Sequence, residues 1–230
     1  MKKTLIMAAL AAVAVGLSFG EDKAPVSTFT DKRDGKVYRI VEINGQVWMA
    51  ENLNYAAKGS VCYGEGGKSI LVYDEDDNPS GTIFSDTEVQ AHCAKYGRLY
   101  DWNTAMTACP AGTHLPSDKE WTRMMEFIGG ESKAGTKLKS STGWKSDKDV
   151  PAGSDDFGWS ALPGGLGDWY GYFYNAGNIG YWWSTTEKNA NLAWSRYMEY
   201  NYEYMDIIII IKTDLLSVRC VQDDGKEKRR

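Results

Sequence analysis

Four cysteines constrain the fold of this 230-residue chain more than any other feature. They lie far apart, at Cys62, Cys93, Cys109 and Cys220, and no two have the Cys-x-x-Cys spacing of a zinc knuckle or a thiol redox site. An even number of cysteines in an exported chain predicts two disulfides, and four cysteines allow three ways of pairing them. If the chain is exported, its fold is therefore held by two covalent cross-links.

The first twenty residues have the pattern of a secretory signal peptide. Lys2 and Lys3 precede an apolar run at 5–17, and the sequence SFG at 18–20 places small residues where signal peptidase cleaves. The run is shorter than the roughly 18 apolar residues that a membrane-spanning helix needs, and no cysteine follows it to carry a lipid anchor. We therefore predict a secreted or periplasmic protein that begins at Glu21 and has no transmembrane span.

The charge of the chain argues against nucleic acid as a partner. Its 26 lysines and arginines are outnumbered by 31 acidic residues, a net charge of −5, which becomes −7 once the leader removes its two lysines. Phosphate binding needs clustered Lys and Arg, and such a cluster occurs at 226–230, where it reads as a solvated tail. The length suits one domain. We divide the chain into a signal peptide at 1–20, a flexible lead-in at 21–33, a domain at 34–222 and a charged tail at 223–230.

Local patterns predict a hairpin and two helices. Residues 36–43 alternate apolar and polar side chains, Asn44-Gly45 is a two-residue hairpin signal, and 46–50 supplies the return strand. Each helix begins with a capping box, in which Ser85 or Ser117 is followed three residues later by a glutamate.

The last third of the chain indicates short antiparallel strands. They are expected at 180–186, 193–204, 207–211 and 215–221. Five consecutive isoleucines at 207–211 are typical of a buried strand. Together the patterns predict two short helices, short antiparallel strands and irregular loops.

Two histidines and an acidic loop are the candidates for chemistry. His114 lies between Cys109 and a helix start, where it could serve as a base or a metal ligand. The sequence supplies no partner set for it, which favours a corner histidine bonded to backbone. His92, on the first helix, is interpreted as a surface residue. The carboxylates at 74–77 invite a cation, but Pro79 stands where an EF-hand loop needs glycine, and a solvated loop is favoured.

Six motifs occur in the order and at the spacings typical of one family. They are VWMAENLNY (47–55), CAKYGRLYDW (93–102), CPAGTHLPSDKEW (109–121), SALPGG (160–165), GYWWSTTE (180–187) and SVRCV (217–221). On these motifs, residues 34–222 resemble the Fibrobacter succinogenes major paralogous domain, a bacterial extracytoplasmic family of undefined biochemical role. More distantly, the chain is similar to the formylglycine-generating-enzyme domain, a relative of C-type lectin-like folds. That likeness implies a single α+β domain of the same architecture, with two short helices, a twisted antiparallel sheet and long irregular loops.

The resemblance also implies how the cysteines pair. Formylglycine-generating enzymes use a late cysteine pair to bind copper and oxidise a substrate cysteine, and residues 184–214 here contain no cysteine. Cys220 matches a closing structural cysteine, which implies the disulfides Cys109–Cys220 and Cys62–Cys93. No thiol is then left to act as a nucleophile. We expect a non-catalytic domain with no cofactor and no metal.

Aromatic side chains supply the candidates for a binding site. The glycine-flanked loop GDWYGYFYN contains Trp169, Tyr170 and Tyr172, and the strand expected at 193–204 would carry Tyr200 and Tyr202 on one face. Flat rings with polar edges stack on sugars and peptides. We expect a binding module for extracellular polysaccharide or a surface protein. The alternatives are a divergent formylglycine-generating-enzyme-like enzyme and a purely structural cell-surface protein.

Overall fold

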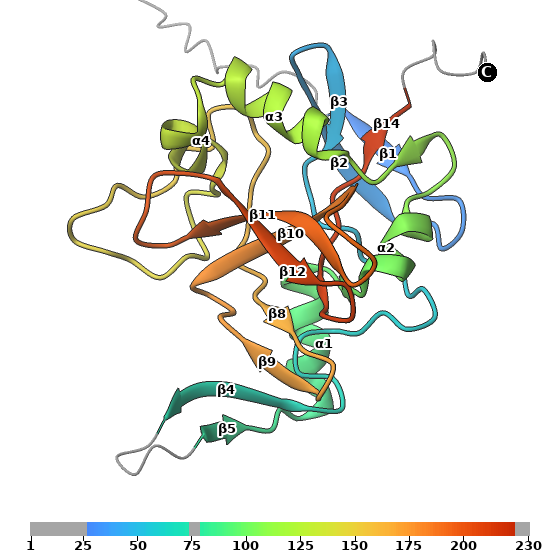
Figure 1. The fold of residues 1–230 in the computed structure, drawn as a ribbon, viewed down its shortest axis with the longest axis vertical. Coiled ribbons are helices and arrows are strands. Elements are labelled where there is room, and N and C mark those ends of the chain that lie inside the picture. The colour runs from blue at the N-terminus through green and yellow to red at the C-terminus, as the bar shows by residue number, and fades with distance from the viewer. Residues whose placement is uncertain (1–26, 74–78, 224–230) are drawn as a thin grey trace, which may run out of the picture.

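The computed structural model describes residues 27–73 and 79–223 of the chain. The predicted signal peptide at 1–20, the acidic residues 74–77 and the tail after residue 223 lie outside the described residues. The described part is an α+β domain of three sheets, four helices and two disulfides (Figure 1). The expected fold class is confirmed at this level, with two helices more than expected.

The first sheet contains the predicted hairpin. Its strands are, in spatial order, β1 (Thr28–Thr30), β2 (Val37–Ile43), β3 (Gln46–Met49), β14 (Val221–Gln222) and β7 (Thr113–His114). Asn44 and Gly45 join β2 to β3 with φ values of 55° and 73°, the left-handed conformation that a two-residue hairpin turn requires. Strand β1 falls within the segment expected as a flexible lead-in. It is ordered because it pairs with β2 and because Phe29 packs against the core.

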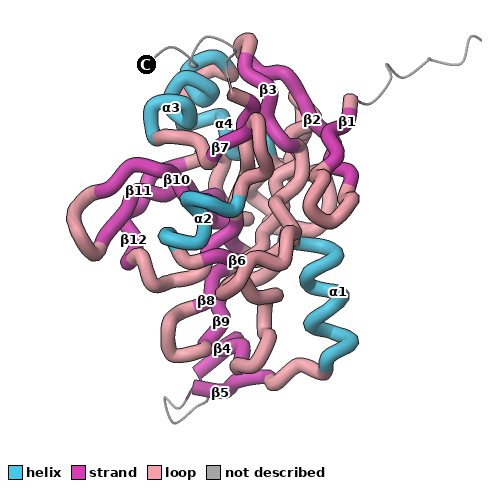
Figure 2. Tube along the Cα trace, turned by 90° about the vertical axis from the view of Figure 1, so that its right-hand side faces the viewer, coloured by secondary structure: helices cyan, strands magenta, loops and turns pink. Residues whose placement is uncertain are grey.

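Two further sheets complete the fold. The second has the order β12 (Asp206–Ile211), β11 (Leu192–Glu199), β10 (Ile179–Glu187), β13 (Leu216–Ser217) and β6 (Leu99–Tyr100). The third has the order β5 (Pro79–Thr82), β4 (Lys68–Tyr73), β9 (Tyr172–Tyr174) and β8 (Leu166–Gly167). Most pairs are antiparallel; β10–β13 and β4–β9 are parallel. Both views place the first sheet at one end of the molecule and the third at the other, with the second between them (Figures 1 and 2).

The helices are α1 (Asp86–Tyr96), α2 (Trp102–Ala108), α3 (Asp118–Phe127) and α4 (Glu131–Leu138). The two capping boxes that predict α1 and α3 are both present. The other two helices lack that signal, which is why the prediction missed them. Asp101 caps α2 through its side chain without a glutamate three residues on, and α4 follows Gly130, which offers no side-chain cap.

A cluster of tryptophans forms the centre of one core. Trp48, Trp121, Trp159 and Trp182 are fully buried, with neighbouring ring centroids 4.8 to 6.5 Å apart. Their tilted and edge-on contacts are the geometries that aromatic pairs prefer. The apolar face of α3, which includes Trp121, packs into this cluster as its spacing predicts.

The two disulfides pair as the family resemblance implies. Cys62–Cys93 ties the loop before β4 to α1, and Cys109–Cys220 ties the end of α2 to the segment before β14. They close sequence separations of 31 and 111 residues. Chain-entropy reasoning assigns about 4 and about 5 kcal/mol of stabilisation to loops of these lengths.

Two strand predictions near the C-terminus are wrong in detail. In the isoleucine strand β12 the side chains alternate between two faces, of which one packs on the core, so Ile208 and Ile210 face the core whereas Ile209 and Ile211 are exposed. The strand expected to reach residue 204 ends at Glu199. Residues 200–205 turn instead, and two of their carbonyls are held by α4 and by the residue that caps it: Glu203 accepts from the Thr136 N–H and Tyr202 from the Lys139 side chain.

Candidate ligand-binding site

A tight turn between β8 and β9 displays two aromatic rings. Gly171, at φ 85°, donates its N–H to the Asp168 carbonyl at 3.1 Å, and Lys68 of β4 donates to the Gly171 carbonyl at 3.0 Å. The Asp168 carboxylate accepts the backbone N–H groups of Tyr170 at 2.9 Å and Tyr172 at 2.8 Å. The sequence Asp-Trp-Tyr-Gly thus supplies hydrogen-bond partners for the backbone of the turn, and its aromatic side chains point away from these bonds.

The rings of this aromatic turn, residues 168–171, are exposed and lie together. Trp169 is 61% exposed and Tyr170 is 68% exposed, and their centroids are 3.8 Å apart with the planes inclined by 36°. Tyr172, at the start of β9, is also exposed. Large aromatic side chains are buried in most folded proteins, and an exposed apolar patch marks an interaction surface. These three rings are therefore accessible to a ligand.

A cavity of about 420 Å³ lies beside Trp169. Its apolar wall includes Phe173 and Leu215, and polar groups from four segments of the chain face it. Those polar residues are Glu65, Asp101, Asn103, Asp168, Lys212 and Thr213. The volume is within the range of small-ligand pockets, and the combination of one exposed ring with convergent polar groups is typical of them.

The cavity is richer in carboxylates than in cations. Lys212 is already occupied, since its Nζ lies 2.7 Å from Glu187 and 4.1 Å from the Trp102 ring centroid. The charge of Asp168 also reaches the neighbouring Asp214. Burial, reinforced by that charge, raises the pKa of Asp214 to about 6. The wall thus offers acceptors that suit hydroxyl donors. In the described part of the chain, no group of three or more His, Cys, Asp and Glu side chains could hold a metal ion.

The other two aromatic candidates lie elsewhere. Tyr200 and Tyr202 belong to the β11–β12 turn instead of one strand face. Tyr202 is 42% exposed and stacks on Tyr204 at 4.7 Å, whereas Tyr200 is half-buried with Lys145 4.8 Å from its ring centroid. Among the described residues, no ring contact joins these tyrosines to Trp169. The five predicted residues thus form two groups, and of the five only Trp169 lines the cavity of about 420 Å³.

The histidine interpretations need correction. His114 bonds to two carboxylates and not to backbone: Nε2 lies 2.8 Å from Glu120 and Nδ1 lies 2.8 Å from Asp223. Asp223 is 109 positions away and arrives through the pairing of β14 with β7, which no local pattern reveals. His92 is half-buried and not a surface residue, because its Nδ1 bonds to the Tyr63 carbonyl at 3.0 Å and its ring meets Phe84 edge-on.

Sequence reasoning missed the polar walls of the cavity beside Trp169. Asp168 carried a signal, because an aspartate in a glycine-containing loop is typical of a turn closed by a hydrogen bond from its side chain to the backbone N–H two residues later. Asp101, Asn103 and Thr213 carried none, since they lie far from Trp169 in the sequence and meet it only around this cavity.

Fold and site together define a disulfide-bonded α+β domain that presents an aromatic turn beside a polar cavity. The family model described as the Fibrobacter succinogenes major domain matches residues 41–222, so the chain belongs to that family. Comparison with curated proteins and with solved structures gives no match. Across residues 27–73 and 79–223, no helix has the length and apolar character to cross a membrane.

Proposed function

We propose that this protein is a secreted, non-catalytic module that binds extracellular carbohydrate at the aromatic turn. The observation that carries the proposal is the exposed Trp169–Tyr170 pair beside a cavity with carboxylate and amide walls. The apolar face of a sugar ring stacks on an indole, and its hydroxyls donate to oxygens such as those of Asp101 and Asn103. The rigid Asp168 turn holds the platform in place before a ligand arrives, which lowers the entropic cost of binding.

Two parts of the proposal concern fold and location. We assign the architecture to the formylglycine-generating-enzyme-like and C-type lectin-like group, on the motifs that the chain shares with it. All four cysteines are in disulfides, which leaves none as the free thiolate that a cysteine-dependent reaction needs. Disulfides persist in oxidising compartments, which supports a secreted or periplasmic location.

Calorimetric titration with soluble polysaccharides tests the proposal. The exported protein is titrated with a β-glucan, a xylan and a galactomannan, each alongside the Trp169→Ala variant. Covering an exposed aromatic side chain contributes about 1.5–3 kcal/mol, so the variant should bind about 10- to 100-fold more weakly. Phe127→Ala removes another exposed ring, on α3, and should bind like the parent. Unchanged affinity of Trp169→Ala for the best ligand would contradict the proposal.

A further inference from the structure

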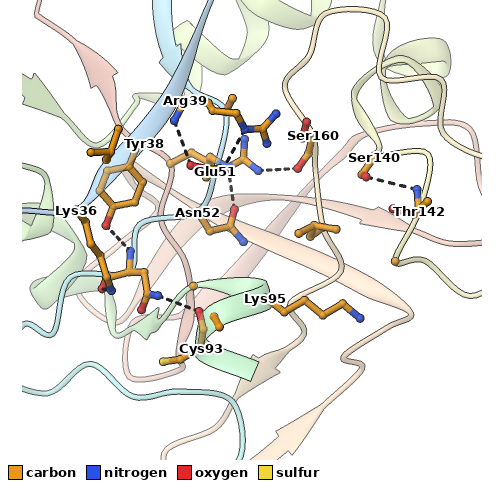
Figure 3. Close-up of a pocket in the computed structure, with 18 residues that line it drawn as sticks. Lys36, Tyr38, Arg39, Glu51, Asn52, Cys93, Lys95, Ser140, Thr142 and Ser160 are labelled. Carbon is orange, nitrogen blue, oxygen red and sulfur yellow. Dashed lines mark hydrogen bonds and ion pairs between the residues drawn. The ribbon is translucent and has the colours of Figure 1, made fainter. Parts of the chain in front are cut away.

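A second cleft, of about 640 Å³, shares no lining residue with the cavity beside Trp169. Figure 3 shows its lining side chains, which come from the start of β2, the segment after β3, the end of α1, the stretches 140–143 and 160–162, and Arg219 before β14. Arg39 lies on β2, and Glu51 and Asn52 lie in the segment after β3. Lys95 lies on α1, and Ser140 lies in one of the loops. The volume is again that of a small-ligand pocket.

This cleft concentrates positive charge in a chain whose net charge is −5. Lys36, Arg39, Lys95 and Arg219 line it, and of the described lining residues only Glu51 is acidic. Glu51 is paired with Arg39, whose Nε lies 3.1 Å from its carboxylate. The positive charges of the other three are therefore not balanced within the lining.

Arg219 places one of these charges at the buried base of the cleft. Its guanidinium donates to the side-chain oxygen of Asn52 at 2.8 Å, to the carbonyls of Met49 and Ser160 at 3.2 and 3.0 Å, and to that of Trp159. Among the described residues, no carboxylate lies within ion-pair distance of it. Burial lowers the pKa of Arg219 to about 9, with Glu51 opposing and Arg39 adding to the fall. An anion in the cleft would stabilise this charge.

The end of α1 does not cancel this attraction. A helix C-terminus carries partial negative charge on its last carbonyls, but here two lining amides donate to those carbonyls. Asn52 Nδ2 bonds to the Tyr96 carbonyl at 2.8 Å, and Asn54 Nδ2 bonds to the Cys93 carbonyl at 2.9 Å. Asn52 is fixed in turn by Trp182, which donates to its Oδ1 at 2.9 Å. These hydrogen bonds hold the asparagine side chains of the cleft in place and supply partners for the last carbonyls of α1.

We propose that this cleft binds an acidic sugar, whose anionic group lies between Arg39 and Lys95. Charge-assisted bonds from Arg and Lys are the strong contacts of an oxyanion. Lys95 has no ion pair among the described residues and contacts the Tyr96 ring at 4.7 Å. The neutral lining includes the hydroxyls of Ser140 and Thr142, which suits a ligand rich in hydroxyl groups. The shared chemistry is a carboxylate or sulfate on a sugar ring.

Calorimetry of the exported protein with three matched probes tests this site. The probes are trigalacturonate, a sulfated galactose trisaccharide and the neutral galactose trisaccharide. Either acidic probe should bind, with an affinity that falls as salt rises, and the neutral one should not. Arg39→Gln and Lys95→Gln should each weaken binding roughly tenfold, the effect of losing one charge-assisted hydrogen bond. Glu51→Gln should strengthen it by removing the lining carboxylate.

The control is Lys148→Gln, which makes the same charge change at a side chain 89% exposed and outside the cleft. It should bind the acidic probes like the parent. Equal binding of neutral and acidic probes, or equal losses in Lys148→Gln and Lys95→Gln, would overturn the proposal. If Trp169→Ala abolishes binding of the acidic probes, the aromatic turn is their site, and this proposal fails while the proposed function stands.

Discussion

The clamp formed by His114 between Glu120 and Asp223 should make the stability of the domain depend on pH. Through it, one ring joins β7 to α3 and to the residue after β14. The hydrogen bond to Glu120, opposed by burial and supported by Asp223, raises the pKa of His114 from 6.5 to about 9. We predict that His114→Gln destabilises the protein near neutral pH and removes the part of its alkaline pH dependence that comes from this clamp.

The magnitude follows from the geometry. A rise from 6.5 to about 9 would contribute about 3 kcal/mol at full strength. His114 is 34% exposed and Asp223 is exposed, so solvent screening reduces the contribution to about 1–2 kcal/mol. The folded-state pKa is the higher one, so the stabilisation is complete below pH 6.5 and is lost as the pH rises through about 9.

Glu120 sets the acid limit of the same clamp. Burial opposes its ionisation, but hydrogen bonds from His114 and Ser117 outweigh burial and lower the pKa of Glu120 from 4.5 to about 2. This contribution is present above pH 4.5 and is lost as the pH falls through about 2. The clamp is therefore strongest between about pH 4.5 and pH 6.5.

Urea unfolding followed by tryptophan fluorescence, with the disulfides intact, measures the effect. The parent should lose about 1–2 kcal/mol of unfolding free energy between pH 6.5 and pH 9.5 relative to His114→Gln. His92→Gln removes the other histidine, outside the clamp, and should retain the slope of the parent. A His114→Gln variant with the same alkaline slope as the parent would refute the assignment of that slope to the clamp.

Two further predictions concern the disulfides and the edge strand. Replacing Cys109 and Cys220 together by Ala should lower the free energy of unfolding by about 5 kcal/mol, and replacing Cys62 and Cys93 should lower it by about 4 kcal/mol. Urea midpoints of the two variants compare these losses. A larger loss for the shorter loop would contradict the chain-entropy account. Ile210→Lys should cost more than about 3 kcal/mol, because it buries a charge in the core, whereas Ile209→Lys on the exposed side should stay within about 0.5 kcal/mol. Thermal melts separate the two outcomes, and similar losses would show that β12 is covered on both faces.

The elements that neighbouring residues specify are predictable from the sequence. Asn44-Gly45 predicts the β2–β3 hairpin because its residues tolerate left-handed φ, and the Ser-x-x-Glu boxes predict α1 and α3 because they satisfy the first N–H groups of a helix. The isoleucines at 207–211 predict a strand for the same local reason. Their burial is not local, since it depends on what packs against each face of β12, and in the described part of the chain the core lies against the face of Ile208 and Ile210.

The same distinction between local and distant residues applies to the cavity beside Trp169 and to the partners of His114. Glycines beside Trp169 and Tyr170 mark a turn that displays rings, and the structure exposes both. The walls of the adjoining cavity come from residues as distant as Asp101 and Thr213, so no window of sequence contains them. The partners of His114 show the same limit, because β14 brings Asp223 to it from 109 positions away.

The cavity beside Trp169 has an acidic lining and the second cleft has a basic one. This contrast shows what the net charge of a protein decides about its ligands and what it does not. A net charge of −5 governs the field far from the protein and disfavours a polyanion that would cover the whole surface. At contact distance the nearest groups decide, because screening reduces interactions beyond about 8–10 Å in physiological salt. Lys36 and Arg39 come from one segment and Lys95 and Arg219 from two others, and folding places all four around one cleft with a single carboxylate in its described lining. A small anion that fits inside therefore meets a local charge opposite in sign to that of the whole chain.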